Sequence, residues 1–140
     1  MDNRTDDLLK IRLGIETASL SDNMRDEERF QNTSIRPAIK FQSDLLIEAF
    51  KNYAKKHKCV FYSLSIDKKM VYIENAIQRD MKFRNSLKGM IIGAFTVPEY
   101  KQYIQNSSAL NKRMMQIVIE RLKDNVLLLD NENPPLHKAG

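Results

Sequence analysis

The chain has 140 residues, of which 42% are hydrophobic and 29% charged, and it carries a net charge of +5. This length is that of one domain, and the composition is that of a globular protein, so a wholly disordered chain is excluded. One cysteine and two histidines exclude an internal disulfide and a tetrahedral His/Cys zinc site within one chain.

The N-terminus is polar, and no apolar run of signal-peptide length follows it. The longest strictly apolar stretches have four residues, as at 126–129, which is far too short to cross a membrane. Together with an unpaired thiol at Cys59, these features predict a cytoplasmic protein. We expect Cys59 to be a small core residue, because it precedes the apolar run 60–62.

Charge divides the chain into an acidic start and a basic remainder. Residues 1–33 hold eight acids and five bases, a net of −3, whereas residues 34–140 hold ten acids and eighteen bases, a net of +8. We interpret 1–33 as a partly disordered acidic arm with a short helix near 5–12 that ends at Gly14. Residues 34–129 form a helical domain, and 130–140, with Pro134 and Pro135, form a flexible tail. The arm could lie across the basic body, but the sequence leaves open whether it docks.

Helical spacing of apolar residues follows the arm. The first apolar stripe predicts a helix over 36–56, with Thr33 or Ser34 as its N-cap. A second helix is predicted over 66–81 with Ser65 as its cap, and a third near 84–95. The alternative for 58–73 is a strand pair, but its alternation is poor and we favour helix.

The sequence from Thr96 to Glu99 has the form of a capping box, in which a hydroxyl and a carboxylate three residues later satisfy free backbone N–H groups. It opens a short helix to about residue 104, and a long helix is predicted over 109–128. The expected fold is therefore all-α: a single-domain bundle of about five helices with a polar N-terminal arm.

Motifs for catalysis are missing from the sequence. The body's acids lie beside bases at helical spacing, and there is no nucleophile motif and no glycine-rich phosphate loop. His57 and Cys59 fit a basic helix end better than a metal site. We therefore expect no catalytic residue, no metal and no cofactor, although the possibility of an enzyme stays open. Gly89 and Gly93, four residues apart, are expected to allow close approach of another helix.

The basic body makes nucleic acid a possible partner. Segment 96–121 has the outline of a helix-turn-helix motif whose second helix begins at Ser108 with polar and basic residues. The residues that could hold phosphates or other anions are Lys51, Lys55, Lys56, Lys58, Arg79, Lys82, Lys88 and Lys112.

Polar residues also interrupt two otherwise apolar helices. Arg84 and Asn85 lie in one, and Asn111 and Arg113 in the other. If the two helices pack together, these four could form a polar pocket or a partner surface. The alternative is that the amides cap helices and the arginines point to water.

Four stretches, 32–37, 83–90, 96–100 and 106–114, resemble a group of short uncharacterised proteins from Bacteroidetes, flavobacteria especially. The similarity covers about residues 30–128. The resemblance implies a bacterial cytosolic protein. It implies no mechanism, although some members of the group carry the label "glyoxalase". Enzymes of the glyoxalase I type use paired βαβββ modules and strand-borne metal ligands, and no motif here matches theirs.

The leading hypothesis is a small cytosolic helical protein that acts by binding a protein partner or by self-association. Its amphipathic helices and seven methionines, which supply adaptable apolar surface, support this hypothesis. Nucleic-acid binding is the first alternative, and a glyoxalase-type lyase, suggested by the family label alone, is the second.

Overall fold

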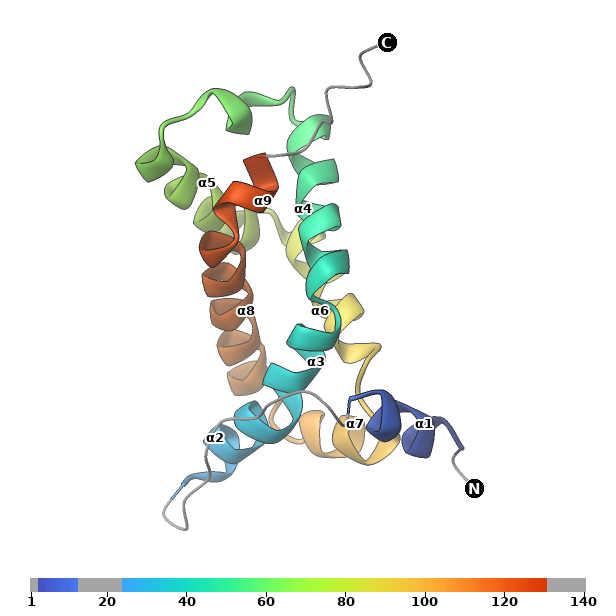
Figure 1. Ribbon diagram of the computed structural model, residues 1–140. Helices are drawn as coiled ribbons and strands as arrows, with labels where there is room; N and C mark the ends of the chain where they lie inside the picture. Colours follow the sequence, from blue (N-terminus) through green and yellow to red (C-terminus); the bar gives the residue numbers. More distant parts are fainter. Residues whose placement is uncertain (1–2, 13–23, 131–140) are drawn as a thin grey trace.

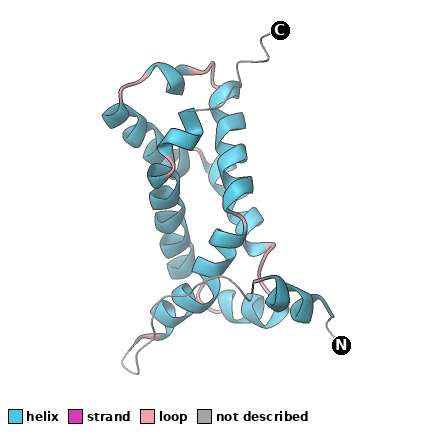
Figure 2. Cartoon of the chain, in the orientation of Figure 1, coloured by secondary structure: helices cyan, strands magenta, loops and turns pink. Residues whose placement is uncertain are grey.

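The computed structural model describes residues 3–12 and 24–130, and every regular element within those ranges is helical (Figures 1 and 2). In chain order these elements are α1 (Asn3–Ile11), α2 (Asp26–Phe30), the π-helical segment η1 (Gln31–Ile35), α3 (Arg36–Phe41), α4 (Ser43–Lys56), the 3₁₀ turn η2 (Val60–Ser63), α5 (Ile66–Arg79), α6 (Met81–Ile92), α7 (Val97–Tyr103), α8 (Ser107–Asp124) and α9 (Val126–Asp130). The all-α prediction is confirmed, and 58–73 forms no strand pair. The described residues form more helices than the five or so that were expected. The expected helix end at Gly14 and the expected tail beyond Asp130 lie outside the described residues.

Two predicted helix starts are confirmed. The Ser65 hydroxyl accepts a hydrogen bond from the backbone N–H of Lys68 at the start of α5. At the start of α7, Thr96 Oγ1 accepts from the Glu99 N–H at 3.2 Å, and Glu99 Oε1 accepts from the Thr96 N–H at 2.8 Å. Both halves of the capping box are therefore formed.

The helix expected over 36–56 is broken at Gln42. Its side-chain Nε2 donates to the Met90 carbonyl at 2.7 Å, so the break is held against the last turn of α6. The N-cap expected at Thr33 or Ser34 is wrong, because α2, η1 and α3 form one continuous helical stretch from residue 26 to 41. Within it, the Thr33 hydroxyl donates back to the Arg29 carbonyl. The expected boundary between arm and body at residue 33 thus falls inside a helix.

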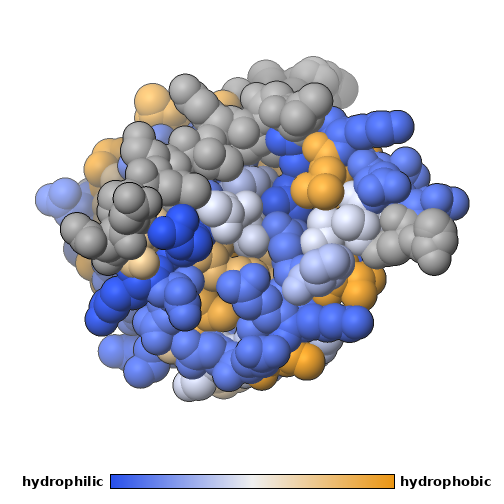
Figure 3. Space-filling view, turned by 90° about the horizontal axis from the view of Figure 1, so that it is seen from below, coloured by the Kyte–Doolittle hydropathy of each residue, from blue (hydrophilic) through white to orange (hydrophobic). Residues whose placement is uncertain are grey.

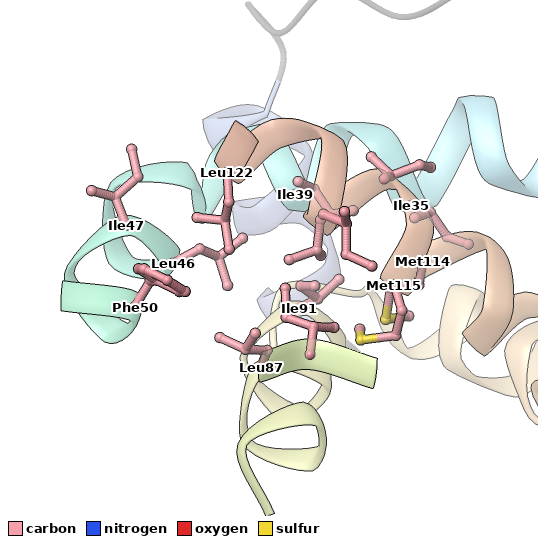
Figure 4. Close-up of a cluster of buried hydrophobic side chains, with 14 of the residues drawn as sticks. Ile35, Ile39, Leu46, Ile47, Phe50, Leu87, Ile91, Met114, Met115 and Leu122 are labelled. Atoms are coloured by element: carbon pink, nitrogen blue, oxygen red, sulfur yellow. The ribbon is translucent and has the colours of Figure 1, made fainter. Parts of the chain in front are cut away.

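Helix α4 packs against α6 and α9, helix α8 packs against α5 and α6, and α3 leads into the lower end of α4 (Figure 1). Figure 4 shows side chains from η1, α3, α4, α6 and α8 meeting between these helices. Phe50, Leu87 and Met114 in this cluster are fully buried. The core therefore fixes α4 and α6 relative to each other, which matters for the site described below.

The first described part of the N-terminal arm, residues 3–12, contacts the body through two arginines. Arg12 makes two hydrogen bonds to the Glu99 carboxylate, at 2.9 and 3.0 Å, and a third to the Ala94 carbonyl. Arg4 donates to the Gly93 carbonyl at 2.8 Å. The Arg12 side chain is 5% exposed, whereas α1 itself has no buried residue. The attachment of α1 thus depends mainly on arginine contacts with the α6–α7 corner.

Glu99 belongs to both the capping box and this ion pair. Burial alone would raise the pKa of Glu99, but hydrogen bonds from Arg12, the Thr96 backbone and Ser34 outweigh burial and lower the pKa. The carboxylate therefore stays ionised at neutral pH and holds α1, η1 and α7 together.

A second acidic segment, α2, covers the start of α8. Asn106 donates to the Glu27 carboxylate at 3.1 Å, and Arg113 forms an ion pair with Glu27 at 3.6 Å. Arg113 also donates to Gln31 at 2.9 Å. This part of the acidic arm thus lies against a basic stretch of the body.

The end of the molecule formed by α1, α2 and α7 is seen from below in Figure 3. Val97, Tyr100 and Ile104 are exposed here. In the part of this face that is not grey, hydrophobic side chains stand apart among hydrophilic ones (Figure 3). The visible part of this face therefore presents no broad apolar surface.

Cys59 is exposed, so the expectation of a core cysteine was wrong. After α4 the chain passes through two left-handed residues, Lys58 at φ 66° and Cys59 at φ 58°. The Cys59 N–H bonds to the Ala54 carbonyl at 3.0 Å. This turn points the thiol outward and brings Phe61, which is fully buried, into the core.

The two glycines of α6 do not serve a close helix contact within the described chain. Gly89 is exposed, and a Cβ atom added there would meet nothing within 4 Å. A Cβ atom on Gly93 would meet only carbonyl oxygens of its own helix, at 3.3 and 3.5 Å.

Candidate functional site: two hollows beside Tyr53

Asp80 forms the corner between α5 and α6. Its backbone is extended, which ends α5, and its Oδ1 accepts the Phe83 N–H at 3.2 Å as the N-cap of α6. Its second oxygen accepts the Tyr53 hydroxyl at 3.2 Å, so the same carboxylate also fastens this corner to α4.

Tyr53 lies in a stack of three rings. Its ring centroid is 4.1 Å from Phe83 on α6 and 4.1 Å from His57 at the end of α4. The position of His57 follows from the helical repeat, because it lies four residues after Tyr53 on the same face. With both ring faces covered and the hydroxyl bonded to Asp80, Tyr53 is held in one orientation.

The electrostatics of this pair favour binding over proton transfer. The hydrogen bond from the Phe83 backbone is the largest cause of a lowered pKa for Asp80, and the Tyr53 hydroxyl and the nearby His57 add to it. Burial, and then the hydrogen bond to Asp80, raise the pKa of Tyr53 to about 12. At neutral pH Asp80 is therefore ionised and Tyr53 protonated, and neither group readily exchanges a proton with a bound molecule.

The stack has a hollow on each side. The first, which we call the α5 cavity, has a volume of about 700 Å³ and is lined by Tyr53, His57, Val60, Tyr72, Asn75, Ala76, Arg79, Asp80 and Met81. The second, the α4–α6 groove, has a volume of about 510 Å³ and is lined by Leu45, Glu48, Ala49, Asn52, Tyr53, Lys56, His57, Asp80, Lys82, Phe83, Ser86 and Met90. Tyr53, His57 and Asp80 line both, so they form a shared wall.

Three of the basic residues predicted as anion ligands reach these hollows. Lys56 and Lys82 line the groove at the end where α4 finishes and α6 begins, and Arg79 lines the α5 cavity.

The other predicted anion ligands are placed elsewhere. Lys51 forms an ion pair with Glu48 at 3.4 Å. Lys55 and Lys58 are exposed around the end of α4, and Lys88 is a partly buried residue of α6. Lys112 belongs to α8 and lines a different hollow with Arg113.

The four residues expected to meet in a polar pocket have separate surroundings. Arg84 donates to the Ile77 carbonyl at 3.5 Å within the α5–α6 corner, and Asn85 is exposed. Asn111 accepts the Tyr103 hydroxyl at 2.6 Å, and Arg113 bonds to η1 and α2 as described above. In the described chain they therefore form no common constellation.

Within 96–121 the structure has α7, a turn and α8, in the order that the helix-turn-helix hypothesis requires. However, Asn111 and Arg113, two side chains of the second helix that could read base edges, are bonded to other parts of the chain. The acidic α2 also lies against this start.

Sequence reasoning missed Tyr53 and Asp80 as site residues. Tyr53 lies within the helix predicted over 36–56 and carries no site signal there, and Asp80 lies inside the helix predicted over 66–81. An aspartate immediately before the first apolar residue of a helical pattern, as Asp80 stands before Met81, is a usable N-cap signal. Had Asp80 been interpreted as a cap, the corner between α5 and α6 would have followed.

Comparisons with known proteins, and the search for a metal site or a membrane-spanning helix, point to no function for this chain. No protein-family model matches the chain, and no match was found among curated proteins or solved structures. Among the described residues, no three His, Cys, Asp or Glu side chains gather as a metal site. None of the helices in the same ranges has both the length and the apolar character needed to cross a membrane.

Proposed function

We propose that the protein is a binding protein that accepts an amphipathic helix of a partner protein in the α4–α6 groove. The observation that carries this proposal is the length of the groove along two helices. On α4 it extends from Leu45 to Lys56, and on α6 from Lys82 to Met90. At 1.5 Å per residue the α4 side is about 16 Å long, or three helical turns.

The lining of the groove suits the apolar face of a helix. Leu45, Ala49, Phe83 and Met90 supply apolar surface. Leu45 is 47% exposed, although the same helix buries Leu46 completely. Helix-in-groove recognition uses anchors spaced three and four residues apart, and a strip of three turns offers room for three such anchors.

Charge selects the kind of helix. Lys56 and Lys82 stand at one end of the groove, and Asp80 beside them is already bonded to Tyr53 and Phe83. At the other end Glu48 is paired with Lys51. A partner helix with acidic residues at the end near the two lysines complements this pattern.

A second copy of the chain fits less well than an acidic helix. The body carries a net charge of +8 over residues 34–140, so two such bodies repel each other. Self-association through the groove is therefore treated as an outcome of the test.

The test uses two synthetic helical peptides that share one apolar face but carry either glutamates or lysines at one end. Fluorescence anisotropy with the intact protein should show binding of the acidic peptide and at least tenfold weaker binding of the basic one. Ala49→Arg, which fills the groove floor, should abolish binding. Lys82→Glu should reduce the preference for the acidic peptide or reverse it.

Gln116→Arg, an exposed change on α8, is the matched control and should bind as the wild type does. Equal affinity for both peptides, or no effect of Ala49→Arg in a variant that melts normally, would refute the proposal. Light scattering completes the test. If the protein is a dimer and Ala49→Arg dissociates it, the groove is occupied by a second copy of the chain. If single-stranded DNA displaces the peptide from the groove, nucleic acid is the favoured partner.

A further inference from the structure

The α5 cavity lies on the other side of the Tyr53–His57 wall and is not used by the proposed groove. This hollow of about 700 Å³ is open to solvent along Val60, Arg79 and Met81, all of them exposed. Small-molecule sites of this size are mostly apolar with a few placed polar groups. The cavity is formed where α5, the η2 turn and the end of α4 meet.

Two polar side chains of this cavity are unused by the described part of the chain. Arg79 and Asn75 lie four residues apart and so on the same face of α5. Neither side chain forms a hydrogen bond or an ion pair with any residue in 3–12 or 24–130. By contrast, the neighbouring Arg84 donates to a backbone carbonyl. A guanidinium and an amide one turn apart offer several N–H donors to one anionic group.

Apart from Asp80, the rest of the lining is apolar or aromatic. Val60 is 48% exposed and Met81 52% exposed at the rim, and Ala76 and Tyr72 lie between them on α5. The Tyr72 ring packs on Phe61 with centroids 5.3 Å apart, which anchors this part of the wall to the core. The cavity thus has a fixed apolar wall beside an unused cationic group.

The charge of the lining sets a limit on the ligand's charge. Arg79 contributes one positive charge and Asp80 one negative charge, and the Asp80 carboxylate is committed to Tyr53 and Phe83. A dianion such as a phosphate monoester would meet repulsion from Asp80 that a single carboxylate meets less strongly. We infer that the α5 cavity, through Arg79 and Asn75 beside the apolar wall of Val60, Ala76 and Met81, binds a small monocarboxylate with a flat apolar body.

The probe is 1-naphthoate, compared with the uncharged 1-naphthamide and with phenyl phosphate, in ¹H–¹⁵N NMR titrations of the full-length protein. Naphthoate should shift the signals of α5 and η2 and bind at least tenfold more tightly than either comparison compound. Tenfold corresponds to about 1.4 kcal/mol.

Arg79→Gln should weaken naphthoate binding about tenfold, and Arg79→Lys should lie between the two, because lysine keeps the charge but loses the planar fork. Lys112→Gln, which removes an exposed charge on α8, is the matched control and should have no effect. Because Arg79 is exposed, an unchanged melting temperature should confirm that its variants fold.

Equal binding of the amide, shifts confined to other helices, or wild-type affinity in Arg79→Gln would overturn the inference. Tighter binding of phenyl phosphate would replace the carboxylate by a phosphate as the ligand class. Ala49→Arg should leave naphthoate binding unchanged, so failure of the groove proposal and failure of this inference can be told apart.

Discussion

Replacing Glu99 by glutamine tests whether α1 is held on the body mainly by the ion pair between Arg12 and Glu99. The amide keeps the size of the side chain and can still accept the Thr96 N–H, because capping boxes use Glu or Gln at this position. It removes the charge that faces Arg12, whose side chain is 5% exposed. The change therefore acts on the attachment of α1 and leaves the start of α7 capped.

The size of the effect follows from the two hydrogen bonds between Arg12 and Glu99. Glutamine has one acceptor oxygen, so the bond from Arg12 Nη1 becomes a neutral one and the bond from Nη2 is lost. A hydrogen bond to a charged group contributes about 1.5–3 kcal/mol and a neutral one about 0.5–1.5, so the change costs about 3 kcal/mol. Leaving a buried guanidinium unpaired costs about 3–5 kcal/mol when it cannot move. Here α1 can leave the body, since it has no buried residue of its own. We therefore expect about 2–3 kcal/mol, or roughly a hundredfold increase in the detached fraction.

Hydrogen exchange measures this detachment directly. In Glu99→Gln the amides of α1 should exchange roughly a hundredfold faster, because an isolated helix of nine residues is marginal in water. The amides of α4 and α8 should keep their protection. Lys10→Gln, an exposed charge change in α1, is the control. Unchanged exchange in α1, or an equal loss of protection in α4 and α8, would refute the reasoning.

Four further predictions follow from single residues. The pKa of Glu99 is lowered in the folded protein. Its contribution to the docking of α1 is therefore present above the pKa of the unfolded state and is lost as the pH falls through the pKa of the folded state. NMR signals of residues 3–12 should show that α1 detaches at acid pH in the wild type, and no such pH dependence in Glu99→Gln. Gly89→Ala should raise the free energy of unfolding by about 0.5–1 kcal/mol in urea titrations, because the added Cβ meets no atom and alanine favours the helix; a loss of stability would contradict the open surroundings of Gly89. Lys58→Gly should also raise the free energy of unfolding, by about 0.5–1 kcal/mol in the same titrations. Glycine relieves about 1–2 kcal/mol of left-handed backbone strain at residue 58 and costs about 0.5–1 kcal/mol in chain entropy. A destabilised variant would show that the turn is not strained. In ultraviolet titration one tyrosine, assigned by Tyr53→Phe, should ionise near 12. Asp80→Asn should lower that pKa towards 10 without reaching it, because burial, the largest cause of the raised pKa, remains; an unchanged value would remove Asp80 from its causes.

Much of the fold is readable from the sequence because its helices are amphipathic and several are capped locally. The spacing along α5 and α8 follows the helical repeat, and the caps at Ser65 and Thr96 need only neighbouring residues. Such local signals do not depend on the rest of the chain.

Features set by distant contacts were not readable. The break at Gln42 is tied to the Met90 carbonyl, 48 residues away in the chain. Arg12 finds its carboxylate on Glu99, 87 residues later. Nothing near Gln42 or Arg12 in the sequence identifies these partners, so the predicted helix ran on through Gln42 and the arm was separated from the body.

The candidate site was only partly predictable for the same reason. Lys56, Arg79 and Lys82 stood out as charges, and the structure places them on two adjoining hollows. Tyr53 and Asp80 carried no such signal, because their significance comes from meeting each other across 27 residues of chain. The charge pattern of the sequence therefore identified the basic residues at the edge of the site, whereas Tyr53 and Asp80 could be identified only from the fold.

The shared wall determines whether the two hollows can influence each other. Tyr53 is held on both ring faces and at its hydroxyl, by His57, Phe83 and Asp80. A side chain with all its contacts satisfied has no second arrangement for a ligand to select, and coupling between sites requires an element with two arrangements. A helix in the groove and a carboxylate in the α5 cavity should therefore bind independently in the wild type. Asp80→Asn, which exchanges the charged acceptor of the Tyr53 hydroxyl for a neutral one, is the variant in which coupling is expected to appear.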